Sequence, residues 1–320
     1  LLYGKISMFT FICRRLIISI PTLLAVMSII FILVRIVPGD PAQTILGDQA
    51  SASALDAMRE RLGLNRPLLE QYFDFMGSAL TGDWGESMVT GKPILGEVVN
   101  VLPYTLELTF VAVIFGVLTG LPLGIWSALH RNQLIDYLVR LTTLIGLSFP
   151  AFVSAILLLI VFAINLGWFP VISSGGRDDV IGWFRDLALP ALTLGTIMTA
   201  YIARVTRSSM LGVLREDYIR TARAKGVPNI IIIWHHALRN ALIPVVTMIG
   251  LFLGVLVGNS VLTEIVFNRP GLGKLIVGAL GQRDYTMLQG LMVCYAFIII
   301  FINMLTDLTY GLIDPRVKYQ

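Results

Sequence analysis

The stretch Asp217-Tyr218-Ile219-Arg220-Thr221-Ala222-Arg223-Ala224-Lys225-Gly226-Val227-Pro228 is polar, although long apolar runs flank it on both sides. It predicts a helix of about nine residues, or roughly two and a half turns. Asp217 is expected to cap the first turn, and Arg223 and Lys225 suit the negative end of the helix dipole. Gly226 fits a left-handed position after the last turn, and Pro228 prevents the helix from continuing. Because a polar helix lies between apolar runs of membrane length, we expect another protein to dock on it.

The composition is that of an integral membrane protein. Of the 320 residues, 56% are hydrophobic and 14% are charged, whereas soluble domains carry about 25% charged residues. Apolar runs of about 20 residues predict transmembrane helices, and they occur at 16–37, 103–129, 138–164, 188–206, 241–263 and 287–311. We therefore predict an all-α membrane protein with six transmembrane helices. Met8 is a more plausible start than Leu1, so residues 1–7 are expected to be a remnant.

The distribution of basic residues orients the six spans. Fourteen of the 24 Lys and Arg residues fall on the side that carries both termini and the polar stretch. Basic residues gather on the cytoplasmic side of membrane proteins, so both termini and the loop 207–240 are predicted to be cytoplasmic. Residues 1–15 then form a cytoplasmic flank, and 38–102 form a segment outside the membrane. The net charge of +4 is explained by this asymmetry and requires no nucleic acid.

Catalytic and metal-binding patterns are not found. His130, His235 and His236 lie on predicted cytoplasmic loops and do not form a His-Glu-x-x-His zinc helix. The tetrapeptide Gly271-Leu272-Gly273-Lys274 is not a phosphate loop, because Leu275 follows where Ser or Thr is required. We therefore predict a chain that is not an enzyme and binds no cofactor or metal of its own.

Ionisable residues near the spans favour no proton pathway. Arg35, Glu107, Glu264 and Asp307 all fall near predicted span ends, where we expect interfacial positions or structural pairing rather than ion transport. An ATP-independent secondary transporter or channel is the alternative function, and the lack of a mid-membrane carboxylate or histidine argues against it.

Small residues recur at intervals of four in two of the predicted spans. The second span contains Gly116, Gly120 and Gly124, and the fifth span contains a similar row. Small residues at this spacing allow helices to approach closely, so we favour packing over a substrate-facing bend for the second span. The third span contains Pro150, which predicts a kink. The fifth span directly follows the polar loop, and we favour it as a wall of a transport pathway. Its row consists of Gly250, Gly254 and Gly258.

Several motifs together resemble one family. The polar stretch is followed by His236-Ala237-Leu238-Arg239-Asn240-Ala241-Leu242-Ile243-Pro244. This pair of motifs resembles the cytoplasmic coupling loop of ABC-importer permeases, specifically the dipeptide and oligopeptide permease family. Arg220-Thr221-Ala222 stands where importers in general have Glu-Ala-Ala, a departure typical of the peptide branch. Arg14-Arg15 with Pro38-Gly39-Asp40-Pro41, and Gly82-Asp83-Trp84-Gly85, are similar to the same family, and the resemblance runs from Arg14 to Lys318.

The resemblance implies an importer permease of the bacterial inner membrane, with its permease domain at 16–320. Its partners would be membrane lipid, a second related permease in a heterodimer, two cytoplasmic ATPase subunits that bind the ATP, and a periplasmic substrate-binding protein. The two permeases would form the translocation pathway for peptides or similar small solutes. Family members carry di- and oligopeptides, glutathione, nickel chelates and some sugars. The residues expected to couple the chain to an ATPase are Asp217, Tyr218, Arg220, Thr221, Ala222, Arg223, Ala224, Lys225 and Gly226.

Overall fold

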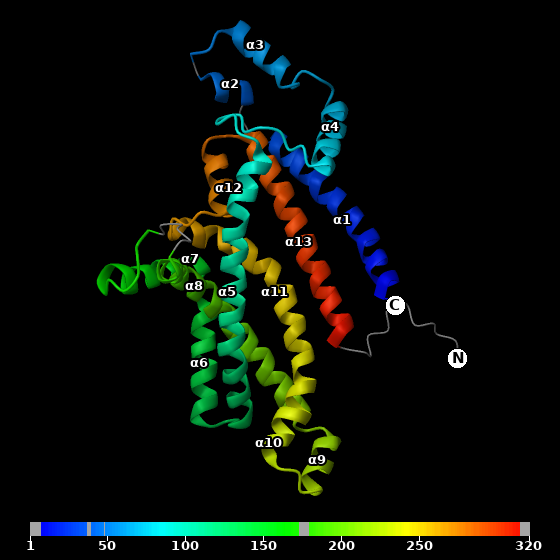
Figure 1. Ribbon diagram of the computed structural model, residues 1–320, viewed down its shortest axis with the longest axis vertical. Coiled ribbons are helices and arrows are strands. Elements are labelled where there is room, and N and C mark those ends of the chain that lie inside the picture. Colours follow the sequence, from blue (N-terminus) through cyan, green and yellow to red (C-terminus); the bar gives the residue numbers. More distant parts are fainter. Residues whose placement is uncertain (1–7, 37–39, 48, 173–178, 314–320) are drawn as a thin grey trace. The chain divides into compact units, whose positions relative to one another are not determined.

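The computed structural model describes residues 8–36, 40–47, 49–172 and 179–313, and its elements are labelled in Figure 1. Across these ranges every element is helical, and a single isolated bridge joins Glu86 to Pro93. The chain divides into two compact units, which are described separately. Unit 1 comprises residues 1–103 and 270–304, and unit 2 comprises residues 104–269 and 305–320. The predicted all-α membrane class is confirmed.

In the part of the chain that the structure describes, five helices are long and apolar enough to cross a membrane. They cover Arg14–Ile36, Ile94–Leu129, Val180–Val213, Asn229–Val266 and Tyr285–Thr309. Several are longer than the predicted spans: the 38 residues of Asn229–Val266 reach about 57 Å, whereas about 20 residues suffice to cross the hydrocarbon. These helices continue beyond the predicted spans with unbroken helical hydrogen bonds. Some residues that we predicted to lie in loops are therefore helical.

The third predicted span is divided into two helices. α6 (Leu134–Ser148) and α7 (Ala151–Leu158), continued by the π-helix η1 (Leu159–Asn165), are bent by 102° at their junction. Pro150 has no N–H and disfavours a helical residue before it, and Phe149 accordingly adopts an extended conformation with φ −101° and ψ 135°. We predicted one kinked helix over 138–164, and the structure instead has two helices with a sharp bend between them. The predicted count of six spans holds only if this bent pair is counted as one span.

Unit 1 contains short helices as well as long ones. Its elements are α1 (Met8–Ile36), α2 (Pro41–Leu46), α3 (Ala52–Arg61), α4 (Leu68–Thr81), the first residues of α5 (Ile94–Leu129), α12 (Leu272–Gly281) and most of α13 (Tyr285–Ile313). α4 packs on α1 through a buried cluster that includes Met27 and Met76, and Tyr72 Oη lies 2.8 Å from Ser28 Oγ. α3 buries no residue and is held to the start of α2 by a 2.6 Å ion pair between Arg59 and Asp40.

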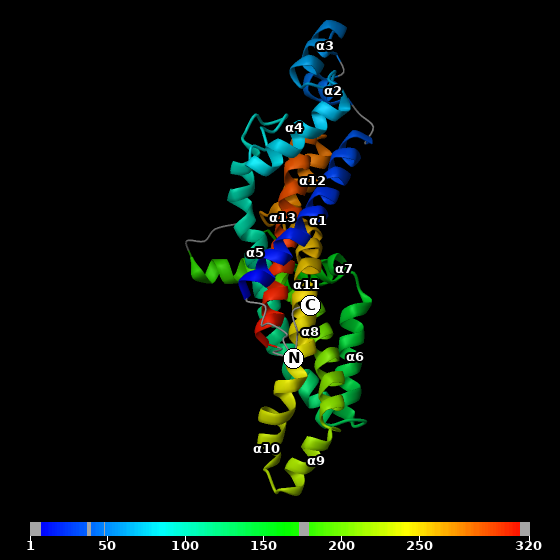
Figure 2. The ribbon, with the colours of Figure 1, turned by 90° about the vertical axis from the view of Figure 1, so that its right-hand side faces the viewer.

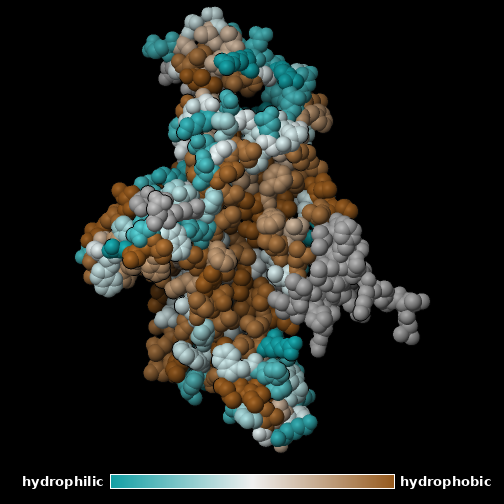
Figure 3. All heavy atoms as spheres, in the orientation of Figure 1, coloured by the Kyte–Doolittle hydropathy of each residue, from teal (hydrophilic) through white to brown (hydrophobic). Residues whose placement is uncertain are grey.

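Unit 2 is built around α8 (Val180–Val213) and α11 (Arg239–Val266). α5 and α6 are antiparallel neighbours joined by a short turn (Figure 1). α9 (Asp217–Ala224) and α10 (Asn229–Ile231) follow α8, and the π-helix η2 (Ile232–Leu238) joins α10 to α11. Figure 2 confirms that α9 and α10 lie at the end of unit 2 where α8 ends. In Figure 3, hydrophobic side chains cover the middle of this unit, and hydrophilic ones surround a small apolar patch at the α9 end.

The glycines of α5 pack against α8, as their spacing predicts. A Cβ atom added at Gly116, Gly120 or Gly124 would lie 2.6, 2.8 or 2.6 Å from the Cβ atoms of Met198, Ile202 and Thr206 respectively. No side chain fits in that space, so the two helices approach closely because these positions have no Cβ. The packing hypothesis for the second span is confirmed at these three positions.

Candidate functional site

α9 begins one residue earlier than the capping hypothesis requires. Glu216 occupies the N-cap, without a side-chain capping hydrogen bond, and Asp217 is the first helical residue. The prediction that Asp217 caps the helix is therefore wrong. Its carboxylate lies in the first turn, where a negative charge favours the helix dipole, and it accepts a 3.3 Å bond from Arg220. Both side chains are strongly exposed, so this ion pair contributes little to stability.

The C-terminal end of α9 follows the predicted pattern. Gly226 has φ +77°, a left-handed conformation that favours glycine. The N–H of Gly226 donates to the carbonyl of Arg223 at 2.9 Å, and the N–H of Val227 donates to that of Ala222 at 3.2 Å. These two bonds form a Schellman motif, which satisfies carbonyls that the end of a helix leaves without partners. The expected role of Gly226 in ending the helix is confirmed.

A single fully buried side chain anchors α9 in unit 2. Ile219 is 0% exposed and belongs to a cluster formed at one end of α5, α8, η2 and α11. Its other buried members are Ile125, Ala128, Met210, Ile232, Ala237 and Ala241. Ala222, one turn after Ile219, and Val227 pack against the same cluster. Burying an isoleucine side chain stabilises the folded state by about 2 kcal/mol. The apolar face of α9, with Ile219 at its centre, therefore holds this short helix in unit 2.

Hydrogen bonds add a second attachment between α9 and the start of α11. Asn240 Nδ2 donates to Tyr218 Oη at 2.8 Å and to the carbonyl of His236 at 3.3 Å. His236 belongs to η2, and its ring lies edge-on to that of His235 with 5.2 Å between centroids. The two histidines were expected on a loop and instead lie on a π-helix, a rare element that often occurs at functional sites.

The remaining side chains of α9 form an exposed surface. We call this the α9 surface, and it consists of Asp217, Arg220, Thr221, Arg223, Ala224 and Lys225. Three of the six are cations and one is an anion, so the surface carries a net positive charge. Exposed apolar side chains follow in the chain at Ile230, Ile231 and Trp234, with exposures of 61%, 46% and 57%. An apolar patch with a polar and charged rim is typical of a protein-docking surface.

A buried ion pair joins the helices of unit 2 near this end. Arg207 of α8 makes two bonds to Asp136 of α6, with Nε–Oδ1 2.6 Å and Nη2–Oδ2 2.8 Å. Ser127 Oγ of α5 donates to the same carboxylate at 2.6 Å, and the N–H of Asn132 donates at 2.9 Å. The Asp136 side chain is fully buried, yet both its oxygens have partners. A carboxylate satisfied in this way ties three helices together.

The sequence analysis located the polar helix but did not single out several residues that hold it in unit 2. All nine predicted coupling residues lie on α9 or its C-terminal cap. Ile219, Asn240 and the Asp136–Arg207 pair were not singled out. Ile219 could have been found, because Ile219 and Ala222 are three apart in a polar helix and share a face. The pair could not, because its members lie 71 residues apart and both carry charges that the topology argument assigned to loops.

Two of the carboxylates expected to be interfacial or structurally paired, Glu107 and Glu264, have partners in the structure. Arg269 Nη2 donates to Glu107 Oε2 at 2.6 Å, and Thr105 Oγ1 donates to the fully buried Glu264 at 2.7 Å. Among the residues that the structure describes, no three His, Cys, Asp or Glu side chains come together in a group able to hold a metal ion.

This arrangement of apolar spans and a short polar helix defines a multi-pass helical membrane protein. Residues 120–319 match the family described as binding-protein-dependent transport system inner membrane component, and residues 8–109 match the family that describes its N-terminal region. The chain belongs to the family of binding-protein-dependent transport permeases, and the resemblance found in the sequence is confirmed.

Curated relatives match over nearly their whole length. The chain is 44% identical over 333 residues to the dipeptide transport system permease protein DppB of Alkalihalophilus pseudofirmus, covering 98% of this chain and 100% of the relative. It is 41% identical over 313 residues to the glutathione transport system permease protein GsiC of Escherichia coli K12, with the same coverage.

A solved structure shares the fold. It is an inward-facing form of the MetNI methionine ABC transporter, with a TM-score of 0.58 and 22% identity over 69% of this chain and 98% of the matched chain. At this identity the likeness concerns the fold alone.

Proposed function

We propose that this chain is the translocation subunit of a peptide-type ABC importer and that the α9 surface is the docking site of an ATPase subunit. One observation carries the docking proposal: α9 is a polar helix held by one buried isoleucine, while its opposite face carries excess positive charge. A polar helix between membrane spans has to be stabilised by water or a partner, and the basic face suits a protein surface with acidic side chains.

The charge distribution supports a cytoplasmic α9. Fourteen of the 24 basic residues fall on the side of α9 and of both termini, which the positive-inside rule assigns to the cytoplasm. The segment 38–102 then lies in the periplasm, where a substrate-binding protein would deliver its ligand. This orientation places the α9 surface where ATP is available.

The family and the relatives support a proposal for the partners and the substrate. We infer a second permease in a heterodimer, two ATPase subunits that bind and hydrolyse the ATP, and a periplasmic binding protein. The relatives are named for dipeptides and glutathione, which supports a short peptide as the substrate. This chain then contributes the pathway and no catalytic group or cofactor.

The contacts of α9 suggest how ATPase movement would reach the membrane. Ile219 touches the ends of α8 and α11 through its buried cluster, and Tyr218 is bonded to Asn240 at the start of α11. A displacement of α9 would therefore push on two long helices at once. Closure of the ATPases would favour one of two arrangements of these helices and so open the pathway to alternate sides.

Gly226→Val tests the coupling role. Valine at φ +77° is strained by about 1 kcal/mol or more, enough to lower the ratio of capped to uncapped α9 roughly fivefold. We expect an importer that assembles but shows reduced uptake, with ATP hydrolysis no longer stimulated by loaded binding protein. Uptake and stimulated hydrolysis are measured together in proteoliposomes, and assembly is measured by co-purification.

The matched control is Gly212→Val. An added Cβ meets no described atom within 4 Å at either glycine, but Gly212 lies inside α8 and lacks a positive φ. The control should transport normally. Wild-type coupling in a fully assembled Gly226→Val importer would show that α9 is not the transmission element. Uptake by the chain reconstituted without ATPase subunits would instead favour the alternative of a secondary transporter or channel.

Cysteine labelling tests the orientation. Thr90→Cys is suited to the outside, because Thr90 is exposed, whereas its neighbour Ser87 is buried and bonded to Asp284. Thr90→Cys should react with a membrane-impermeant thiol reagent in intact spheroplasts. Thr221→Cys, on the α9 surface, should react only after the membrane is opened. Labelling of Thr221→Cys in intact spheroplasts would reverse the proposed orientation.

A further inference from the structure

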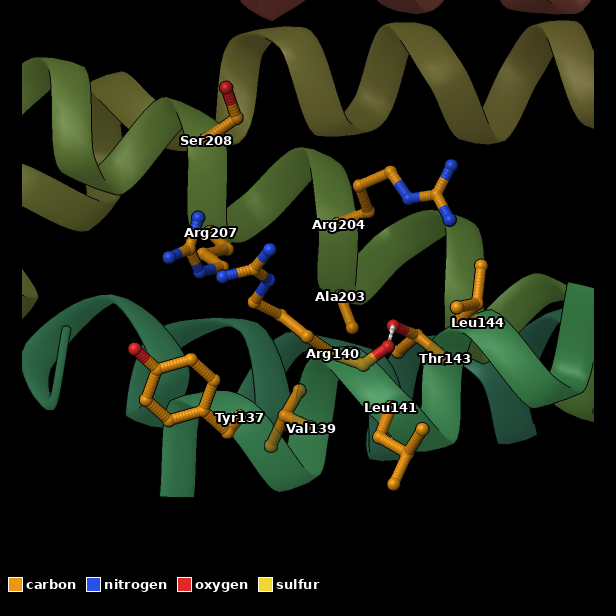
Figure 4. A pocket seen from close by; sticks show the side chains of 10 residues that line it. All are labelled: Tyr137, Val139, Arg140, Leu141, Thr143, Leu144, Ala203, Arg204, Arg207 and Ser208. Atoms are coloured by element: carbon orange, nitrogen blue, oxygen red, sulfur yellow. Dashed lines mark hydrogen bonds between the residues drawn. The ribbon is translucent and has the colours of Figure 1, made fainter. Parts of the chain in front are cut away.

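A basic cavity of about 730 Å³ lies between α6 and α8. Figure 4 shows Arg140 projecting from α6 and Arg204 and Arg207 projecting from α8. Tyr137 and Ser208 add hydroxyl groups to its lining, whereas the Thr143 hydroxyl donates to the carbonyl of Arg140 at 3.0 Å. The cavity thus combines guanidinium and hydroxyl donors, which are the groups that bind phosphate oxygens.

Two of the three cations in this cavity have no counter-charge. Arg207 is committed to Asp136 through its two hydrogen bonds. Arg140 and Arg204 are exposed, and neither forms an ion pair with a carboxylate of the described chain. Arg140 instead lies over the Tyr137 ring, with 6.0 Å between its Cζ and the ring centroid. An anion entering the cavity would meet two uncompensated positive charges without displacing an existing partner.

The depth of these residues matches a lipid headgroup. Arg140 lies six residues into α6, about 9 Å from its first residue, and Arg204 lies nine residues before the end of α8, about 13 Å from it. Both helix ends are cytoplasmic in the proposed orientation. Long arginine side chains at this depth extend towards the interface, so the guanidinium groups reach the level of the lipid phosphates rather than the bulk cytoplasm.

The outer side of α6 beside the cavity is apolar. Leu138, Leu141 and Leu144 are 51%, 53% and 57% exposed, and they follow one another at helical spacing. Leu141 and Leu144 also line the cavity. A ligand with an anionic head and hydrocarbon tails would place its phosphate between the arginines and its tails along this row. A free phosphate ion or a peptide carboxylate would leave the row uncovered.

We propose that this cavity binds the phosphate headgroup of an anionic phospholipid of the cytoplasmic leaflet. Basic pockets between transmembrane helices on this side suit such headgroups. The bound lipid would bridge α6 and α8 beside the Asp136–Arg207 pair. The proposal rests on the proposed orientation but does not depend on the docking role of α9.

Lipid retention by the assembled importer tests the proposal. The complex is delipidated in a neutral detergent and titrated with phosphatidylglycerol or phosphatidylcholine, and bound lipid is counted by native mass spectrometry. Phosphatidylglycerol should bind in preference to phosphatidylcholine. The double variant Arg140→Gln/Arg204→Gln should bind it about 30-fold more weakly, because each arginine near the membrane surface favours anionic lipid. The Arg140→Lys/Arg204→Lys variant should retain most of the binding.

The matched control is the double variant Arg131→Gln/Arg215→Gln. It removes two positive charges from the same end of unit 2, at positions outside the cavity. Both arginines are exposed, and neither lines the cavity. If the two double variants lose phosphatidylglycerol binding equally, the proposal of a lipid site in this cavity is overturned. Displacement of the lipid by millimolar inorganic phosphate would assign the site to a free anion, and displacement by a dipeptide would assign it to substrate; either outcome overturns the lipid proposal. The assay uses neither ATP nor transport, so its failure is distinct from failure of the proposed function.

Discussion

On α5, glycines four residues apart face α8 so closely that an added Cβ would lie within 2.8 Å of a neighbouring Cβ, whereas on α11 two glycines at the same spacing face open space. At Gly254 and Gly258 no described atom lies within 4 Å of an added Cβ. The first glycine of the α11 row, Gly250, does pack, against the side chain of Thr306. The two rows look alike in the sequence, but within this chain only the α5 row serves helix packing along its whole length.

The difference shows what a small-residue row can and cannot predict. Glycines at intervals of four make a face on which another helix can approach. Whether one does depends on where the remaining helices lie, and these are distant in the sequence. Replacing glycines of the two rows by larger residues, and comparing the resulting stabilities, tests this difference experimentally.

The largest effect is expected for Gly124→Val. A Cβ there would lie 2.6 Å from Thr206 Cβ and 2.7 Å from the carbonyl oxygen of Ala203. A backbone oxygen cannot move aside, so α5 must move away from α8. Overpacking of this kind costs about 1–3 kcal/mol, and we expect a clearly lower midpoint of thermal unfolding in detergent. Gly212→Val is the control for valine in a helix, and an unchanged midpoint for Gly124→Val would show that this interface is loose.

An intermediate effect is expected for Gly250→Ala. The added methyl group would overlap the Thr306 side chain, which can rotate, and we expect a loss of about 1 kcal/mol. Thr306→Ala should recover most of that loss when combined with Gly250→Ala, as a double-mutant cycle of unfolding midpoints would measure. If the effects of Gly250→Ala and Thr306→Ala on the unfolding midpoint are simply additive, the contact between the two residues does not position α11.

The smallest effect is expected for Gly254→Ala. The methyl group meets no described atom within 4 Å, and alanine favours a helix over glycine by up to about 1 kcal/mol. The unfolding midpoint of the purified chain should stay the same or rise slightly. A fall as large as that of Gly124→Val would contradict the contrast between the two rows.

Much of unit 2 could be predicted because the signals are local. The polar stretch 217–228 lies between apolar runs, and the last turn of α9 is determined by Gly226 and the following Pro228, which act on their own backbone. The α9 surface follows from the same local pattern. Ile219 was missed only because its helical spacing was not used.

The third span shows where local signals become insufficient. Pro150 predicts a disturbed helix, but Pro190 and Pro244 lie inside α8 and α11, which continue as helices. A proline removes one hydrogen bond in every case. Whether the helix kinks or breaks depends on which neighbouring groups satisfy the freed carbonyls.

The sequence by itself determined the all-α membrane class, the polar helix and its glycine stop, because apolar length, charge placement and backbone preference act within one segment. Only the tertiary structure decided that α6 and α7 are bent by 102°. It also decided that a neighbouring helix packs on the α5 glycines and not on Gly254 and Gly258, and that Asp136 and Arg207 form an ion pair. Each of these depends on the packing of helices that are distant in the chain, where close fit and the pairing of buried charges determine the free energy.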